Sequence, residues 1–162
     1  SSLNESESSW PGAAVEVPAS LSEGSRVLTR WMQEKLGAGP ELVMRDGSGL
    51  SPHTRLSGAV LLRLLVDGWN DLRIQPALVG SLPSPGEDGT LRRRWKGVEP
   101  KPPVRAKTGT LGDARASAIA GYLDDPHLGT VAFVLLMNGR TAAWGIPAMH
   151  ALQEKWILTY LQ

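Results

Sequence analysis

The fold is decided by residues 104–137, VRAKTGTLGDARASAIAGYLDDPHLGTVAFVLLM, in which three strand-like runs follow one another. The runs cover residues 104–111, 115–123 and 128–137, and short stretches rich in Gly, Asp and Pro separate them. The third run carries apolar side chains on both faces, which is usual for a central strand covered by layers on both sides. These runs predict an antiparallel sheet of at least three strands.

Helices are expected on both sides of these runs in the sequence. Apolar residues recur at helical spacing over 22–36, with Gly37 as the stop, and a second helix is predicted over 57–68 with Ser57 as its N-cap. Residues 78–101 are rich in Pro and Gly and should be irregular, and a last helix begins at about Pro147. The buried side of this last helix is predicted to carry Met149, Leu152, Trp156 and Tyr160. The fold class is therefore α+β, an antiparallel sheet flanked by helices.

Composition excludes several classes of function. The 162 residues suit one ordinary domain, and 17 basic against 16 acidic residues leave a net charge of +1. This balance argues against a nucleic-acid partner, which requires a basic excess. The absence of cysteine excludes disulfides, thiolate nucleophiles and cysteine-ligated zinc. The longest uncharged run, residues 126–139, is too short to span a membrane, and the first residues have no signal-peptide pattern.

The sharpest motif is Lys107-Thr108-Gly109-Thr110, which lies inside the first strand-like run. It is not a phosphate-binding loop, because that motif needs Gly before the Lys and a helix after it. Gly109 lacks a Cβ, so an extended peptide could approach the strand edge and pair with it, while Lys107 offers a positive charge to a carboxylate. The N–H of Thr110 could then donate to an oxyanion. The tetrapeptide alone fits an ordinary exposed strand better than a binding site.

The surrounding motifs change this interpretation. In order, the sequence contains the segments DGSGLSP (46–52), RLS (55–57), SLP (81–83), GEDGTL (86–91), VRAKTGTL (104–111), AGY (120–122) and MNG (137–139). The series resembles the C-terminal portion of the D-alanyl-D-alanine carboxypeptidase/endopeptidase family of low-molecular-mass penicillin-binding proteins. This resemblance implies part of a transpeptidase-like fold, with residues 22–162 belonging to that domain and residues 1–21 forming a Ser-rich arm or a segment of a second motif.

The resemblance also implies a chemistry. Members of the family hydrolyse D-Ala-D-Ala bonds in peptidoglycan stem peptides through a serine acyl-enzyme, with Ser-x-x-Lys, Ser-x-Asn and Lys-Thr-Gly motifs lining the cleft. None of the five lysines has a Ser three residues before it, so the nucleophile motif is absent from this sequence. The missing N-terminal portion of the same protein would supply it, and the isolated chain should be inactive. Ser6 is the candidate second-motif serine, although Ser8 stands where Asn is expected; a Ser-rich coil fits the segment equally well.

By the same resemblance, Lys107, Thr108 and Gly109 would bind substrate, Thr110 would donate to the oxyanion, and the loop with Asp46 and Ser48 would lie near the cleft. The implied partners are peptidoglycan stem peptides, with β-lactams as ligands of the full-length protein, in the periplasm or cell envelope. The alternative is a non-catalytic, degenerate relative that binds peptidoglycan or a protein partner.

No cofactor is expected. A metal site is not expected either, since His53, His127 and His150 are widely spaced and the 46–52 loop lacks the alternating acidic ligands of a calcium site. The basic run Arg92-Arg93-Arg94 is predicted to be a solvated loop. In the wider fold that the resemblance implies, N-terminal strands pair beside the third run. Without those strands the third run should have an open edge and promote self-association.

Overall fold

The structure is a computed structural model that describes residues 20–37, 39, 42–99, 101–112, 115–139 and 145–162. The chain divides into two compact units, residues 1–56 and 57–162. Each unit is described by itself. No helix in the described parts is long and apolar enough to cross a membrane.

The first unit is built around α1 (Leu21–Leu36). The hydroxyl of Ser20 accepts a hydrogen bond from the Glu23 N–H and caps the start of the helix. Gly37 ends it in the left-handed conformation, at φ 59°, which a residue with a Cβ rarely adopts. The predicted helix and its glycine stop are confirmed. The segment after α1 is held to it by the Met44 N–H, which donates to the Thr29 hydroxyl at 3.1 Å.

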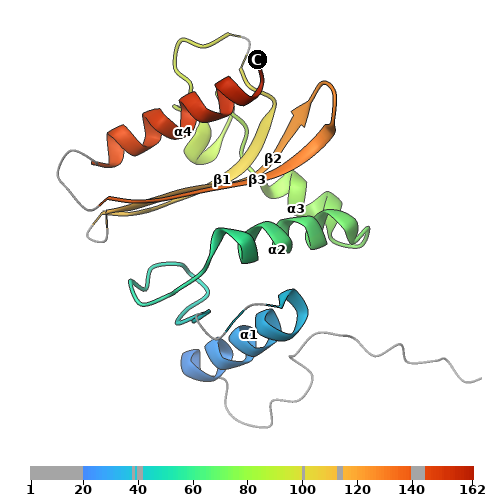
Figure 1. Cartoon of the computed structure of the whole chain (residues 1–162), viewed down its shortest axis with the longest axis vertical. Helices are drawn as coiled ribbons and strands as arrows, with labels where there is room; N and C mark the ends of the chain where they lie inside the picture. The colour runs from blue at the N-terminus through green and yellow to red at the C-terminus, as the bar shows by residue number, and fades with distance from the viewer. Residues whose placement is uncertain (1–19, 38, 40–41, 100, 113–114, 140–144) are drawn as a thin grey trace, which may run out of the picture. The chain divides into compact units, whose positions relative to one another are not determined.

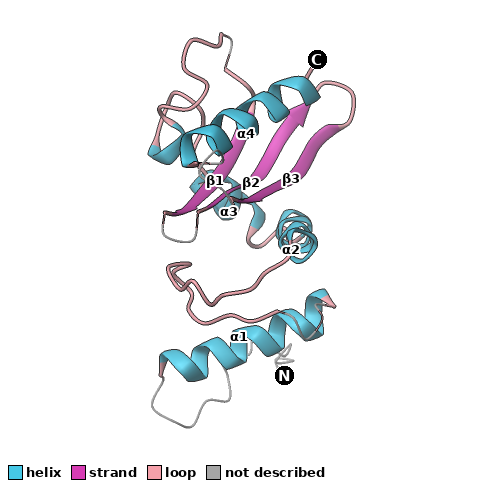
Figure 2. Ribbon diagram, turned by 60° about the vertical axis from the view of Figure 1, so that its left-hand side comes forward, coloured by secondary structure: helices cyan, strands magenta, loops and turns pink. Residues whose placement is uncertain are grey.

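The second unit contains the predicted sheet. The strands β1 (Val104–Leu111), β2 (Ala116–Asp125) and β3 (Gly129–Asn138) pair antiparallel in the order β1-β2-β3, as Figure 2 shows. The α+β class is confirmed. Among the described strands, β2 is central and β3 lies at the edge. The open edge expected for the third strand is therefore confirmed, whereas the central place that its two apolar faces indicated is wrong. β3 is apolar on both faces because helices cover both faces of the sheet. This pattern does not require a neighbouring strand at each of its edges.

Helices cover both faces of this sheet (Figure 1). On one face, Ile157 of α4 (Ile146–Tyr160) packs into a core with Val104, Ala106 and Ile119. On the other face, Leu65 of α2 (Gly58–Asn70) packs with Tyr122. The Ser57 hydroxyl caps α2 by accepting from the Val60 N–H, as predicted. A short helix, α3 (Gln75–Ser81), includes residues 78–81, so the expectation of irregular structure is wrong there. Pro76 does not prevent the helix, because it lies in the first turn, where proline is tolerated.

The predicted buried face of α4 is partly wrong. Met149 is buried as expected, but Trp156 is 61% exposed and Tyr160 is also exposed. The stripe that meets the sheet is Met149, Gln153 and Ile157, and Gln153 is only 1% exposed. The Gln153 amide is tolerated there because its N–H donates to the Ser117 hydroxyl at 3.2 Å and its oxygen accepts from Arg94 at 3.2 Å.

Candidate active-site strand

The strand β1 is anchored at its start and open towards its end. Val104 and Ala106 are 2% and 0% exposed, and their side chains lie in the core beneath α4. From Lys107 onwards the strand is half-buried or exposed, and Gly109 and Thr110 are exposed. The Lys-Thr-Gly-Thr segment therefore lies where a rigid strand emerges from the core.

The outer edge of β1, on the side away from β2, is partly occupied. The Ala106 N–H donates to the Pro83 carbonyl at 3.0 Å instead of to a neighbouring strand. Main-chain groups alternate between the two edges of a strand, so the N–H groups of Thr108 and Thr110 point to the same outer edge as that of Ala106. In the described parts of the chain, no main-chain group hydrogen-bonds either of them. This short edge is able to receive one extended peptide.

Lys107 and Gly109 lie on the face of β1 opposite α4, as the alternation of the strand requires. The Lys107 ammonium is exposed and donates to the Thr108 carbonyl at 2.8 Å. A Cβ added at Gly109 would meet only the Ala118 side chain, at an ordinary 3.8 Å, and its backbone has no positive φ. The fold therefore does not require glycine at this position, which favours a functional reason for it.

Thr108 points to the α4 side and has a side-chain partner. Its hydroxyl donates to the hydroxyl of Thr90, 2.7 Å away, in the short helix η2 (Gly89–Leu91). Thr90 belongs to the GEDGTL segment (86–91), and the sequence by itself assigns it no role. No local pattern could reveal the contact, because 18 residues separate the two threonines.

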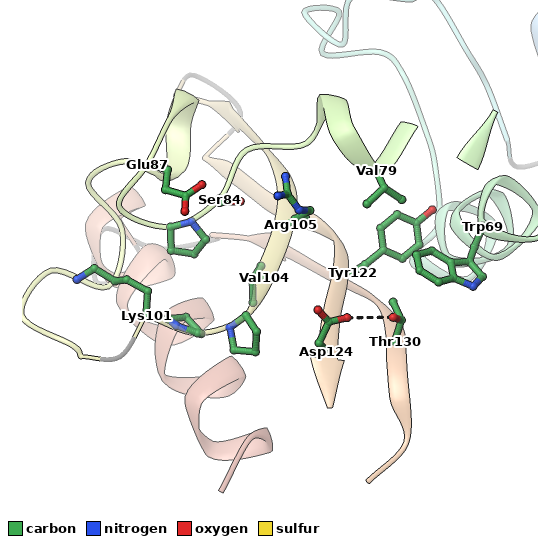
Figure 3. Close-up of a pocket in the computed structure, with 13 residues that line it drawn as sticks. Trp69, Val79, Ser84, Glu87, Lys101, Val104, Arg105, Tyr122, Asp124 and Thr130 are labelled. Carbon is green, nitrogen blue, oxygen red and sulfur yellow. Dashed lines mark hydrogen bonds between the residues drawn. The ribbon is translucent and has the colours of Figure 1, made fainter. Parts of the chain in front are cut away.

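A hollow of about 420 Å³ lies at the other end of β1, beside its first residues (Figure 3). Trp69 and Tyr122 line one side with ring centroids 5.2 Å apart, and Arg105 and Asp124 add charge. Asp124 is already engaged, because it accepts from the Thr130 hydroxyl at 2.9 Å. Burial raises the pKa of Tyr122, whose hydroxyl donates to the Leu65 carbonyl. The four residues 107–110 do not line this hollow.

The loop with Asp46 and Ser48 belongs to the first unit. The Asp46 carboxylate accepts from the Ser48 hydroxyl and from the N–H groups of Leu50 and Ser51, at 2.9 and 3.1 Å. The Ser48 hydroxyl is the main cause of the lowered pKa of Asp46, and both N–H groups lower it further. The Asp46 carboxylate therefore stabilises the conformation of its own loop. A place for this loop beside the cleft stays a prediction, and Ser6 lies outside the described residues.

The expectation for the basic run is wrong for one of its residues. Arg94 is 7% exposed, forms an ion pair with Glu154, and donates to the His150 carbonyl at 3.1 Å. Burial is the main cause, and the Arg94 charge a second one, of the lowered pKa of His150. Arg92 and Arg93 are exposed as predicted. Among the described residues, no three acidic or histidine side chains gather as a metal site would require.

Comparison with solved structures places this strand in a known fold. Penicillin-binding protein 4 from Haemophilus influenzae matches with 25% identity and a TM-score of 0.69, over 90% of this chain and 33% of that one. The same protein complexed with a β-lactam matches with 27% identity and a TM-score of 0.68, over 89% and 34%. The chain thus spans about a third of the length of these structures.

A predatory endopeptidase from Bdellovibrio bacteriovorus, solved in complex with an immunity protein, has a TM-score of 0.68 over 85% of this chain and 36% of that one. At 17% identity this likeness shows the fold alone. No curated protein sequence matches the chain. The family model of D-Ala-D-Ala carboxypeptidase 3 (S13) matches residues 11–155, which is most of the chain. The chain therefore belongs to the D-Ala-D-Ala carboxypeptidase 3 (S13) family.

Proposed function

We propose that this chain forms the Lys-Thr-Gly wall of a serine-type D-Ala-D-Ala carboxypeptidase that acts on peptidoglycan stem peptides. The observation that carries the proposal is the outer edge of β1, where two main-chain N–H groups point outwards beside an exposed lysine. A docked stem peptide would add a strand to this edge. Such a module would work in the periplasm or cell envelope, where the S13 family's cell-wall substrate lies.

Each residue of the motif has a distinct role in this proposal. The Lys107 ammonium reaches the outer edge of β1, where it already contacts the Thr108 carbonyl. There the ammonium from one face of the strand and the Thr108 hydroxyl from the other would bind the terminal carboxylate of the peptide by charge-assisted hydrogen bonds. Gly109 has no side chain, so it leaves space on the face of the strand beside that carboxylate. The Thr110 N–H donates to the oxygen of the scissile carbonyl as negative charge develops on it.

The nucleophile would come from a part of the protein outside this sequence. In the acyl-enzyme mechanism a serine hydroxyl attacks the scissile carbonyl, the terminal D-Ala leaves with a proton, and water then hydrolyses the ester. Residues 22–162 are proposed as the part of the transpeptidase-like domain that binds substrate, and Ser6 in the 1–21 arm as the serine of the second motif. β-Lactams would be ligands of the full-length protein.

Titration of the ¹⁵N-labelled chain with Nα,Nε-diacetyl-Lys-D-Ala-D-Ala tests the binding role. We expect amide shifts concentrated at 107–110, abolished by Lys107→Ala and preserved in Lys155→Ala, which removes an exposed lysine on α4. Shifts confined to other residues, or binding that survives Lys107→Ala, would contradict the proposed site.

A fluorescent penicillin separates binding from catalysis. Because the sequence has no Ser-x-x-Lys motif, we expect no covalent label on this chain. A labelled band that Lys107→Ala abolishes would show that a nucleophile is present after all. If the chain on its own and the full-length protein both fail to label while the stem peptide still binds, the non-catalytic alternative becomes the better description.

A further inference from the structure

The loop of residues 83–91, here named the stop loop, closes one end of the free edge of β1. Its Pro83 carbonyl occupies the place that a neighbouring strand would take opposite Ala106. The first unoccupied outward N–H along the strand is therefore that of Thr108. A peptide docked on the edge has only the stretch from Thr108 to Thr110 available.

The stop loop is held in shape by its own contacts. The Asp88 carboxylate accepts from the Ser84 N–H at 2.8 Å, and the Leu91 carbonyl accepts from the Gly86 N–H at 3.3 Å. Gly89 has a φ of +48°, and a Cβ there would meet the Pro83 ring at 2.7 Å. Leu91 is fully buried in the core beneath α4. The loop is thus a fixed obstacle and not a segment that a ligand could push aside easily.

Thr90 of the stop loop also forms a hydrogen bond with the Thr108 side chain. Their hydroxyl oxygens lie 2.7 Å apart. A hydroxyl proton can rotate, so a carboxylate arriving at Thr108 can accept its proton while Thr90 donates to Thr108 in return. The Thr108 oxygen would remain satisfied throughout, and its χ1 angle would stay fixed.

The direction of the docked peptide follows from the proposed function, on which this inference rests. The scissile carbonyl lies at Thr110 and the terminal carboxylate at Lys107 and Thr108. The peptide therefore runs antiparallel to β1, and its end points towards Ala106 and the Pro83 carbonyl. Main chain that continued beyond the carboxylate would run into the stop loop.

We propose that the stop loop determines specificity for a free C-terminal carboxylate. Pro83 blocks the edge to a main chain that continues, and Thr90 is a positioning residue that holds the Thr108 hydroxyl towards the carboxylate. A cross-linked peptide whose terminal residue keeps a free α-carboxylate still fits. A peptide with further residues attached through that carboxylate does not.

Three peptides separate these effects when titrated against the ¹⁵N-labelled chain: diacetyl-Lys-D-Ala-D-Ala, its primary amide, and the same peptide extended by Gly-Gly-amide. We expect the free acid to bind best, the primary amide more weakly, and the extended amide at least about tenfold more weakly than the primary amide. Equal affinity for the two amides would overturn the proposal that Pro83 blocks a continuing main chain. Failure of the free acid to bind would instead overturn the proposed function, and this inference with it.

The role of Thr90 is tested by the ratio of free-acid to primary-amide affinity. Thr90→Val should lower this ratio about tenfold, because the Thr108 hydroxyl would no longer be held towards the carboxylate and its hydrogen bond to that charged group would be lost. Thr90→Ser should retain it, and Thr159→Val, an exposed position on α4, should not change it. A purely structural role would weaken both ligands equally and leave the ratio unchanged, which would overturn the assignment. Amide spectra of each variant establish that it is folded.

Discussion

Two glycines of the sheet should respond in opposite ways to replacement by alanine, and the structure gives the reason for each. A Cβ added at Gly121 in β2 would lie 2.1 Å from the Arg105 carbonyl oxygen and 2.6 Å from the Ala106 Cα, both in the main chain of β1. A Cβ at Gly109 would meet only Ala118, at 3.8 Å. Gly121 is therefore required by the pairing of β1 with β2, whereas Gly109 is not required by packing.

Gly121→Ala should destabilise the protein severely. The clash is with the main chain, so no side-chain rotation relieves it, and the two strands must separate locally. Overpacking a core usually costs about 1–3 kcal/mol, and this clash belongs at or above the upper end, at about 3 kcal/mol. Gly109→Ala should be neutral or stabilising by up to about 1 kcal/mol, because glycine is unfavourable within a strand.

Urea unfolding followed by circular dichroism measures both changes, with peptide titration as the second readout. Gly109→Ala should unfold at the same or a higher urea concentration but bind diacetyl-Lys-D-Ala-D-Ala more weakly, because the new methyl group stands beside Lys107. An unchanged midpoint for Gly121→Ala would refute the register of β1 against β2. Wild-type peptide affinity in Gly109→Ala would refute the functional reason for that glycine.

Three further predictions concern the core beneath α4 and the edge of the sheet. Glu154→Gln should lower the unfolding free energy by about 2 kcal/mol in urea titrations, because it leaves the buried Arg94 without its anion; a change near zero would contradict this. The lowered pKa of His150 means that stability present above pH 6.5 is lost as the pH falls through the lowered value, and His150→Phe should flatten that part of the pH profile of unfolding; an unchanged slope would count against it. Leu136→Lys, at a 39% exposed position on the edge strand β3, should reduce concentration-dependent self-association in sedimentation velocity, whereas a wild-type chain that is monomeric throughout would refute the open-edge argument.

The strands and caps could be predicted because their signals are local. The bounds of β1 follow from the sequence alone, since a Pro pair precedes it and Gly112 follows it. Ser57 and Gly37 each act on main-chain groups within a few residues. Each of these features depends on residues that are close together in the sequence.

The buried face of α4 could not be predicted in the same way. Gln153 looks like a surface residue, and its burial depends on Ser117 and Arg94, which are 36 and 59 residues away in the sequence. Without those partners the aromatic residues Trp156 and Tyr160 are the natural choice for a buried face. Polar contacts between distant segments decide which side of an amphipathic helix meets a sheet, and no periodicity reports them.

The candidate site likewise has local features that the sequence predicts and long-range contacts that it does not. The chemistry of Lys107 and Gly109 can be proposed from four consecutive residues, but the limits of the free edge cannot. Those limits depend on Pro83 and Thr90, which lie 23 and 18 residues before their partners Ala106 and Thr108. The sequence therefore predicts what the strand could bind, and the structure adds how much of a peptide the strand can hold.

The two halves of β1 resolve a physical conflict. A binding edge must be rigid to align a peptide, yet a rigid unpaired strand also invites pairing with other chains. Here the first half is fixed by the buried Val104 and Ala106 and closed by Pro83, and only the short second half is exposed. Two outward N–H groups are enough to align one short peptide beside Lys107, but too few for a long strand of another chain. We therefore expect unwanted pairing to occur at the ten-residue edge of β3 and not at the strand that carries the motif.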